Sequence, residues 1–333
     1  MPSLNTAFTE QIGIEVPIIC GAMYPCSNPE LMAAVSEAGG VAVIQPIAME
    51  FVHGYKLRDG IRYMRTLTDK PLGLNAIVEK SSRIYLDRMK AWVDIALEEG
   101  IRFFVTALGK PDWVVEKVHA VGGYVYHDVT ERKWAERALD HGVDGLICVN
   151  KRAGGHAGAL DPRILYDDLR RFGVPLVCAG GVGDEAGFVD ALDMGYSAVQ
   201  MGTRFIATNE CQSHADYKNA IVQARPEDIV LTEKISGVPV AIIKTAYVEK
   251  TGTKAGWFAR RMLRHPKYKH WMRTLYSVKS IWQLRKVSRQ GMNYKDFFQA
   301  GRSVEGIHKI ESAGQIVTRY AEAVEGAVHA GAA

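Results

Sequence analysis

Three stretches decide the fold of this chain: Val149-Asn-Lys-Arg-Ala-Gly-Gly-His-Ala-Gly158, Pro175-Leu-Val-Cys-Ala-Gly-Gly-Val-Gly183 and Ala198-Val-Gln-Met-Gly-Thr-Arg-Phe205. Each is a short apolar run, typical of a β-strand, that ends in a turn containing glycine. Glycine lets backbone N–H groups at a strand end approach a ligand closely, because no Cβ stands in the way. Successive strand ends of this kind, each followed by a helix, are typical of the phosphate site of a (β/α)8 barrel. We therefore predict a phosphate cradle here, with His156 in the loop beside it.

The rest of the first 225 residues repeats this alternation of apolar runs and segments with helical periodicity. Eight strands in about 190 residues, each followed by a helical stretch, are the pattern of a closed (β/α)8 TIM barrel. The predicted strands are 16–20, 41–44, 71–75, 102–106, 124–128, 145–149, 175–179 and 198–202. The predicted helices are 29–38, 51–67, 83–99, 112–121, 131–141, 162–172 and 184–194, with Asn28, Asp161 and Asp184 as N-caps.

The rival fold is a doubly wound parallel sheet, which predicts a GxGxxG fingerprint in the first strand–helix turn. The turn at Gly21-Ala-Met-Tyr-Pro-Cys26 lacks that pattern, and Gly181-Val-Gly183 lacks the third glycine. We therefore assign the chain to the α/β class, as a TIM barrel with a smaller, mainly helical cap domain. The barrel comprises residues 1–225 plus 303–330, with 303–325 predicted as a helix packed back on it, and the cap comprises 226–302.

The predicted cap contains a strongly basic segment, residues 250–289, with twelve Lys or Arg and no Asp or Glu. Of the 41 basic residues of the chain, 29 therefore remain outside this segment, against 37 acidic residues. Three interpretations stay open for the segment: a solvated face with packed aromatics, a wall for NAD(P)H or a quinone, or contact with an anionic membrane or nucleic acid. A wall for a reductant would favour NADPH over NADH, because its extra phosphate meets the positive charge.

Composition excludes several other classes of protein. No run of 18 apolar residues exists, so we expect no transmembrane segment, and the N-terminus lacks the features of a signal peptide. We therefore expect a cytoplasmic location. The five cysteines form no CxxC pair and no Cys/His ligand spacing, which predicts reduced, buried thiols and no metal site.

Five pieces of the sequence stand in order at predicted strand ends: Pro17-Ile-Ile-Cys-Gly-Ala-Met23, Gly73-Leu-Asn75, Ala153-Gly-Gly-His-Ala-Gly158, Cys178-Ala-Gly-Gly181 and Gln200-Met-Gly-Thr-Arg-Phe205. Together they resemble the nitronate monooxygenases, formerly called 2-nitropropane dioxygenases. These FMN-dependent TIM-barrel oxidoreductases are grouped with flavin enoyl-acyl-carrier-protein reductases and NADH:quinone reductases. The resemblance covers most of residues 10–225 and the predicted closing helix.

The resemblance implies where FMN lies. It places Ala22 and Met23 along the isoalloxazine and gives Asn75 a hydrogen bond to that ring. It places His156 near the reactive face of the flavin, as the catalytic residue. The phosphate would be held through backbone N–H groups and a hydroxyl by Gly180, Gly181, Met201, Gly202 and Thr203. The cofactor site is completed by Gly155, Ala179 and Gln200.

The function implied by the resemblance is oxidation of alkyl nitronates with O2 to a carbonyl compound and nitrite. A neutral His156 would take a proton from the carbon next to a nitro group or steady a nitronate. The alternative is an NAD(P)H-dependent flavin enzyme that reduces a quinone, oxygen or an enoyl thioester. A hypothesis of another class is a non-catalytic barrel whose basic arm binds membrane or nucleic acid.

Some residues and partners stay undecided at this point. His127 and Asp128, at the end of the fifth strand, are open between a catalytic and a structural role. Arg204 is open between assisting the phosphate and a structural ion pair, and Lys151 and Arg152 between attracting an anion and a solvated loop. We expect a small-molecule substrate, NADPH or NADH as a reductant, O2, and no nucleic-acid partner. The oligomeric state is open, with a homodimer as one alternative.

Overall fold

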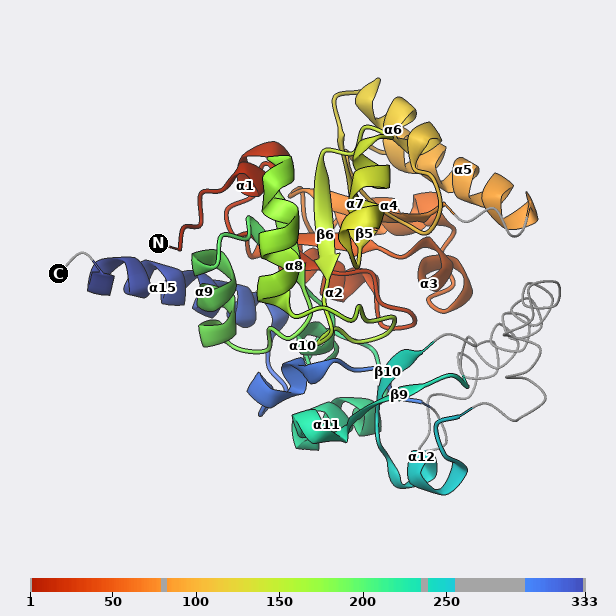
Figure 1. The fold of residues 1–333 in the computed structure, drawn as a ribbon. Coiled ribbons are helices and arrows are strands. Elements are labelled where there is room, and N and C mark those ends of the chain that lie inside the picture. The colour runs from red at the N-terminus through yellow and green to blue at the C-terminus, as the bar shows by residue number, and fades with distance from the viewer. Residues whose placement is uncertain (1, 79–82, 235–238, 255–296, 332–333) are drawn as a thin grey trace.

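The computed structural model describes residues 2–78, 83–234, 239–254 and 297–331, and its centre is a closed barrel of eight parallel strands. Helices between the strands cover the outside of the barrel, as in Figure 1. The predicted TIM barrel is therefore confirmed. The strands are β1 (Ile18–Cys20), β2 (Val41–Ile44), β3 (Leu72–Ile77), β4 (Phe103–Ala107), β5 (Tyr124–Val129), β6 (Gly145–Val149), β7 (Leu176–Ala179) and β8 (Ala198–Met201).

Most helices of the barrel begin and end close to the predicted positions. The prediction of one helix over 51–67 is wrong: the chain forms two helices, because Gly54 takes a left-handed φ of 77° and breaks the segment. The first of the two begins at Pro46, a residue suited to a first helical turn. The helices are α1 (Ala7–Ile12), α2 (Pro29–Glu37), α3 (Pro46–Phe51), α4 (Leu57–Arg65), α5 (Arg83–Glu98), α6 (Asp112–His119), α7 (Arg132–Leu139), α8 (Pro162–Leu169) with η1 (Arg170–Phe172), α9 (Glu185–Asp193), α10 (Thr203–Ile206) and α11 (Ala215–Gln223).

Helix α1 fills the end of the barrel at which the strands begin. Its Phe8 is fully buried and meets Phe103 and Tyr126 edge to face, with ring centroids 5.6 and 5.4 Å apart. The Tyr126 hydroxyl donates a hydrogen bond of 2.7 Å to Gln11 Oε1, which fixes the helix in place. These contacts leave the carboxyl ends of the strands as the place for a ligand, as in other barrels of this kind.

The described part of the predicted cap is built around a β-ribbon. Strands β9 (Ile229–Thr232) and β10 (Val240–Ile243) pair antiparallel, preceded by η2 (Pro226–Asp228) and followed by α12 (Ala246–Thr251). The sequence analysis did not predict this ribbon. Residues 235–238 and 255–296, with most of the basic segment 250–289, lie outside the described residues.

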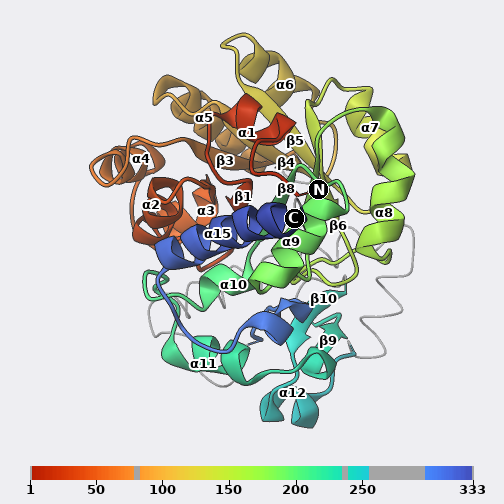
Figure 2. The same ribbon diagram turned by 90° about the vertical axis from the view of Figure 1, so that its left-hand side faces the viewer.

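The chain returns to the barrel through η3 (Arg302–Gly306) and ends in α15 (Ala313–Gly331), which packs on α2 and α9 (Figure 2). The predicted helix over 303–325 is therefore wrong in its start. The helix begins only at Ala313, whose backbone N–H donates to Glu210 Oε2 at 2.9 Å. A carboxylate at a helix N-terminus satisfies a free N–H group, and Glu210 stands 103 positions earlier in the chain. Across the described residues no helix has the length and apolar character needed to span a membrane.

Candidate active site

The ends of β7 and β8 form a cradle of backbone N–H groups. Ala179 pairs with Gln200 in the sheet, so the turns that follow these strands lie side by side. Gly180 and Gly181 take left-handed φ values of 117° and 88°, which glycine adopts without strain. Within the described residues, no hydrogen bond is donated by the backbone N–H groups of Gly180, Gly181, Gly202 and Thr203. Unpaired donors at neighbouring strand ends fit a phosphate group.

A third segment completes this cradle. The backbone N–H of Gly301 donates to Thr203 Oγ1 at 3.0 Å, which leaves the hydroxyl proton of Thr203 available to a ligand. Beside it, Arg302 N–H donates to Arg152 O at 2.9 Å. A Cβ on Gly301 would lie 2.6 Å from Arg152 O, so only glycine fits there. The sequence analysis missed Gly301, because its position depends on a return of the chain from far away.

The loop that carries His156 is fastened to the cradle by Asn150, a fully buried residue directly after β6. Its backbone N–H donates to Ala179 O at 3.0 Å, and its side-chain Nδ2 donates to Gly180 O at 2.9 Å. Its Oδ1 accepts from Arg152 N–H at 2.8 Å, which shapes the start of the loop. Asn150 was also missed, although a buried asparagine at a strand end is a common anchor of a turn.

On its other side the loop is held by the β-ribbon. Ala241 of β10 donates its N–H to Gly155 O at 2.7 Å, and Gly155 has a φ of 66°. His156 is thus placed between the phosphate cradle and the ribbon. Burial lowers the pKa of His156 from its ordinary value, so the imidazole is neutral at pH 7. A neutral imidazole has one nitrogen that accepts a proton and one that donates a hydrogen bond.

Further predicted cofactor residues line the barrel interior beneath the cradle. Strand residues alternate between the two faces, and the interior cluster that includes Tyr126 and Ala198 places Asn75 and Gln200 on the inner face. In the described part of the chain the amides of Asn75 and Gln200 make no hydrogen bond. Met23 Sδ lies 3.4 Å from where a Cβ on Gly202 would stand. Ala22 packs against the interior cluster.

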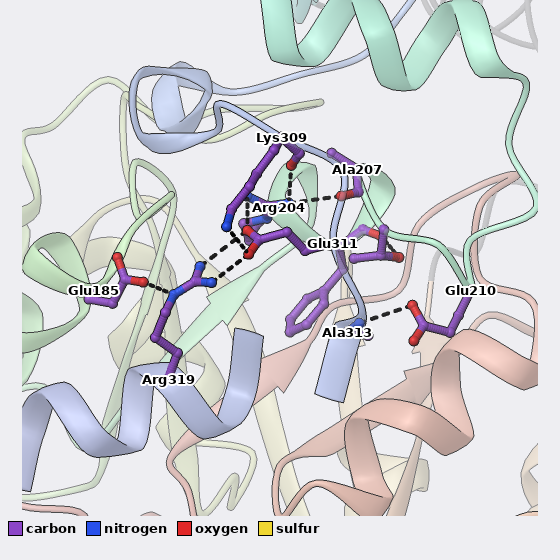
Figure 3. Close-up of polar contacts among 10 residues, drawn as sticks. Glu185, Arg204, Ala207, Glu210, Lys309, Glu311, Ala313 and Arg319 are labelled. Atoms are coloured by element: carbon purple, nitrogen blue, oxygen red, sulfur yellow. Dashed lines mark hydrogen bonds and ion pairs between the residues drawn. The ribbon is translucent and has the colours of Figure 1, made fainter. Parts of the chain in front are cut away.

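Of the charged candidates, Arg204 has a structural role. Its side chain is 1% exposed, forms an ion pair with Glu311 at 3.5 Å and donates to Ala207 O at 2.8 Å (Figure 3). Lys151 pairs with Asp161 at 2.9 Å, and Arg152 with Glu305 at 3.1 Å. The Arg152 Nε lies 2.7 Å from where a Cβ on Gly181 would stand, so its side chain borders the cradle.

The two undecided residues of β5 point in opposite directions. His127 lies between the interior residues Tyr126 and Asp128 and therefore faces outward, where its Nδ1 is 2.8 Å from Thr106 Oγ1. Burial lowers the pKa of His127 to about 4. His127 is thus a neutral residue of the outer barrel layer, away from the cradle. Asp128 faces the interior, where the predicted cofactor site lies.

Fold and site together define a TIM-barrel protein with unpaired backbone N–H groups at two neighbouring strand ends and a neutral histidine in a loop beside them. A family model described as nitronate monooxygenase matches residues 5–322, and the chain belongs to that family. It is 30% identical over 280 residues to a nitronate monooxygenase of Pseudomonas aeruginosa, covering 70% of this chain and 78% of that protein.

The chain is also similar to a relative that is named for a different activity and to a solved structure. The chain is 29% identical over 263 residues to the (3aS,4S,5R,7aS)-5-hydroxy-7a-methyl-1-oxo-octahydro-1H-indene-4-carboxyl-CoA dehydrogenase of Rhodococcus jostii, covering 78% of this chain and 72% of that protein. Among solved structures, FabK from Thermotoga maritima superposes with a TM-score of 0.80 at 28% identity, covering 98% of each chain. The chain is therefore similar to relatives that are named for more than one activity.

Proposed function

We propose that this protein is an FMN-dependent oxidoreductase that oxidises alkyl nitronates with O2 to a carbonyl compound and nitrite. The observation that carries the proposal is a neutral His156 in a loop fastened to a phosphate cradle by Asn150. When bound, FMN supplies the group that accepts electrons from the substrate. Membership of the nitronate monooxygenase family supports this chemistry.

The residues of the strand ends fit FMN. The unpaired N–H groups of Gly180, Gly181 and Gly202, with the Thr203 hydroxyl, would hold its phosphate. The unpartnered amides of Asn75 and Gln200 would hydrogen-bond its ring, and Ala22 and Met23 would provide an apolar wall. The cradle suits a single phosphate, and the chain carries no dinucleotide fingerprint, so we expect FMN and not FAD.

His156 would handle the proton of the substrate. The unprotonated nitrogen of a neutral imidazole takes a proton from the carbon next to a nitro group, and the N–H nitrogen donates a hydrogen bond to a nitronate oxygen. Burial favours this role, because the low pKa of His156 keeps the accepting nitrogen free of a proton at neutral pH. The attachment of Gly155 to β10 fixes the loop in which the histidine stands.

The test is an anaerobic titration of the purified protein with propyl nitronate, NADH and NADPH in turn, while the flavin absorbance is followed. Bleaching by propyl nitronate, followed by reoxidation with O2 and release of nitrite, is the expected result. The cofactor is released by heat and weighed by mass spectrometry. A protein that purifies without flavin and binds polyanions in a salt-sensitive way contradicts the proposal and favours the non-catalytic hypothesis.

A second candidate is an NAD(P)H-linked flavin enzyme that acts on a thioester. The similarity to a carboxyl-CoA dehydrogenase at 29% identity and to FabK at 28% favours it. When an enoyl thioester is reduced, the carbon next to its carbonyl gains a proton, and the N–H nitrogen of His156 would supply it in this second proposal. Bleaching by NADPH or NADH but not by nitronate, with reoxidation by an enoyl thioester or a quinone, would select this candidate.

We extend the proposal to the two domains. Residues 1–225 with 303–330 would hold the cofactor, and residues 226–302 would cover it. The contact of Ala241 with Gly155 supports that arrangement. The preference for NADPH rests on the charge of residues 250–289, most of which lie outside the described residues, and it stays a prediction. Equal use of NADH and NADPH at low ionic strength would contradict this preference.

A further inference from the structure

Asp128, at the end of β5, shares an interior layer with the predicted cofactor residues. A path that starts at Ile19 and passes to the paired residue on each next strand goes once around the barrel. It returns to the first strand at position 11, eight residues before its start. At a constant height along the barrel axis, the residue on each next strand therefore lies one position further along the chain than the paired residue. From Asn75 this rule leads to Asp128 on β5 and Ala179 on β7, two strands apart each time. Such layers of four side chains from alternate strands fill TIM barrels, and the fourth member here is Gly21.

The carboxyl group of Asp128 has no partner in this layer. Its Oδ1 is buried and makes no hydrogen bond, and within the described residues it takes part in no ion pair. Of the other members of the layer, Gly21 and Ala179 have no polar side-chain atom, and the amide of the adjacent Asn75 makes no hydrogen bond to Asp128 Oδ1. The residue as a whole is partly exposed. Because α1 fills the other end of the barrel, this exposure is toward the strand ends, where the cofactor is proposed to lie.

Among the described residues of the neighbouring strands, no cation faces Asp128. Strand β4 carries no ionisable residue, and the only one on β6 is the buried Cys148. His127 faces the outside of the barrel and His156 stands in the loop after β6, both neutral through burial. Burial without a compensating charge raises the pKa of Asp128 to about 7. The group is therefore partly protonated at neutral pH, and its O–H is a hydrogen-bond donor directed at the site.

A buried carboxyl oxygen without a hydrogen-bond partner is unfavourable, so a ligand that pairs with it gains affinity. We propose that Asp128 is a further cofactor-contacting residue: in its protonated form it donates a hydrogen bond to an acceptor atom of the flavin ring and makes cofactor binding depend on pH. This inference rests on the proposed function, because it takes FMN as the ligand. Ionisation of the carboxyl removes the donor and turns an attraction into a repulsion between oxygen atoms.

The experiment measures the dissociation constant of FMN by flavin fluorescence from pH 5.5 to 8.5. The variants are Asp128→Asn, which keeps the size and an N–H donor, and His127→Gln, a control on the outer face of the same strand. For the unmodified chain and His127→Gln, the dissociation constant should rise above pH 7, at most tenfold per pH unit. For Asp128→Asn it should lack this rise. Riboflavin is a second probe, because it has no phosphate that titrates in this range.

Three outcomes would contradict the inference. Equal pH dependence of binding in the unmodified chain and Asp128→Asn, with both probes, means that Asp128 does not contact the ring. Binding that tightens with pH only when Asp128 is present means that a carboxylate accepts a hydrogen bond, which reverses the proposed direction. Binding of no flavin by the unmodified chain at any pH overturns the proposed function, and this inference with it.

Discussion

His156 and His127 are both neutral through burial, yet only His156 stands in the loop that Asn150 fastens to the end of β7. His156 stands beside the phosphate cradle, whereas His127 contacts Thr106 on the outer face of β5. We expect His156→Ala to retain FMN and to slow flavin reduction by nitronate or nitroalkane about 10²–10⁴-fold, as for loss of a general base. Stopped-flow reduction measures this, with His127→Gln as the control. Unchanged reduction by every active donor in His156→Ala would leave that histidine without a chemical role.

The raised pKa of Asp128 should also make the stability of the protein depend on pH. Its pKa is about 7 in the folded protein, above the ordinary value of 3.8, so the folded state binds its proton more tightly than the unfolded state does. The contribution of this proton to the free energy of unfolding is fully present below pH 4 and is lost as the pH rises toward and through 7. Asp128→Asn should therefore be more stable than the unmodified protein at pH 8, by on the order of 1–3 kcal/mol, and this advantage should be clearly smaller at pH 5. Urea unfolding of flavin-free protein at the two pH values measures it; an equal difference at both would contradict it.

A substitution at Gly301 tests the role of the third segment of the cradle. Its φ of −99° allows any residue, but a Cβ would stand 2.6 Å from both Arg152 O and Gly154 N. Gly301→Ala should cost about 1–3 kcal/mol of stability through overpacking and should weaken FMN binding. Gly326→Ala is the control, because a Cβ there meets nothing within 4 Å on helix α15 and should stabilise the protein slightly. Equal FMN affinity in the two variants would show that Gly301 is not part of the cofactor site.

At the scale of elements, an ion-pair network joins α15 to the turn after β8. Figure 3 shows Glu311 between Arg204 and Arg319, while Arg319 also pairs with Glu185 of α9. Arg204 and Glu311 are 1% and 8% exposed, so they are shielded from water. The network therefore fixes α10, whose first residue is Thr203, against the C-terminal helix.

Glu311→Gln should destabilise the protein by about 3–5 kcal/mol, because it leaves the buried Arg204 charge without its counterion. Urea unfolding at neutral pH measures the change. Asp87→Asn is the matched control, since its pair with Arg83 spans 3.9 Å and is 63% and 94% exposed. Such an exposed pair is worth less than about 1 kcal/mol. A cost of the same size in both variants would show that burial of the network does not matter.

At the scale of the whole molecule, cofactor binding should raise the thermal stability through mass action. A ligand at a hundred times its dissociation constant stabilises the folded state by about 2.7 kcal/mol. If the N–H groups after β7 and β8 bind a phosphate as proposed, FMN should raise the melting temperature of flavin-free protein much more than riboflavin does at equal concentration. Scanning fluorimetry with both flavins measures the shifts. Equal shifts would mean that the cradle does not bind the phosphate.

Local rules predicted the elements of the barrel well. Each predicted strand of the barrel is present, and Asp161 and Asp184 cap their helices as expected, accepting from Arg163 N–H and Gly187 N–H. Such features depend on short-range periodicity and capping. The error over 51–67 arose because α3 and α4 share one helical periodicity, and only the turn at Gly54 separates them.

The sequence by itself determined the barrel, the strand ends that carry glycines, and the loop that carries His156. Those features follow from patterns a few residues long. Only the tertiary structure decided that Gly301 closes the cradle, that Glu210 starts α15, and that Asp128 faces inward while His127 faces outward. The first two depend on contacts between residues about a hundred positions apart. The last depends on the register of a closed barrel, because a shift of one residue would exchange the two faces of the strand.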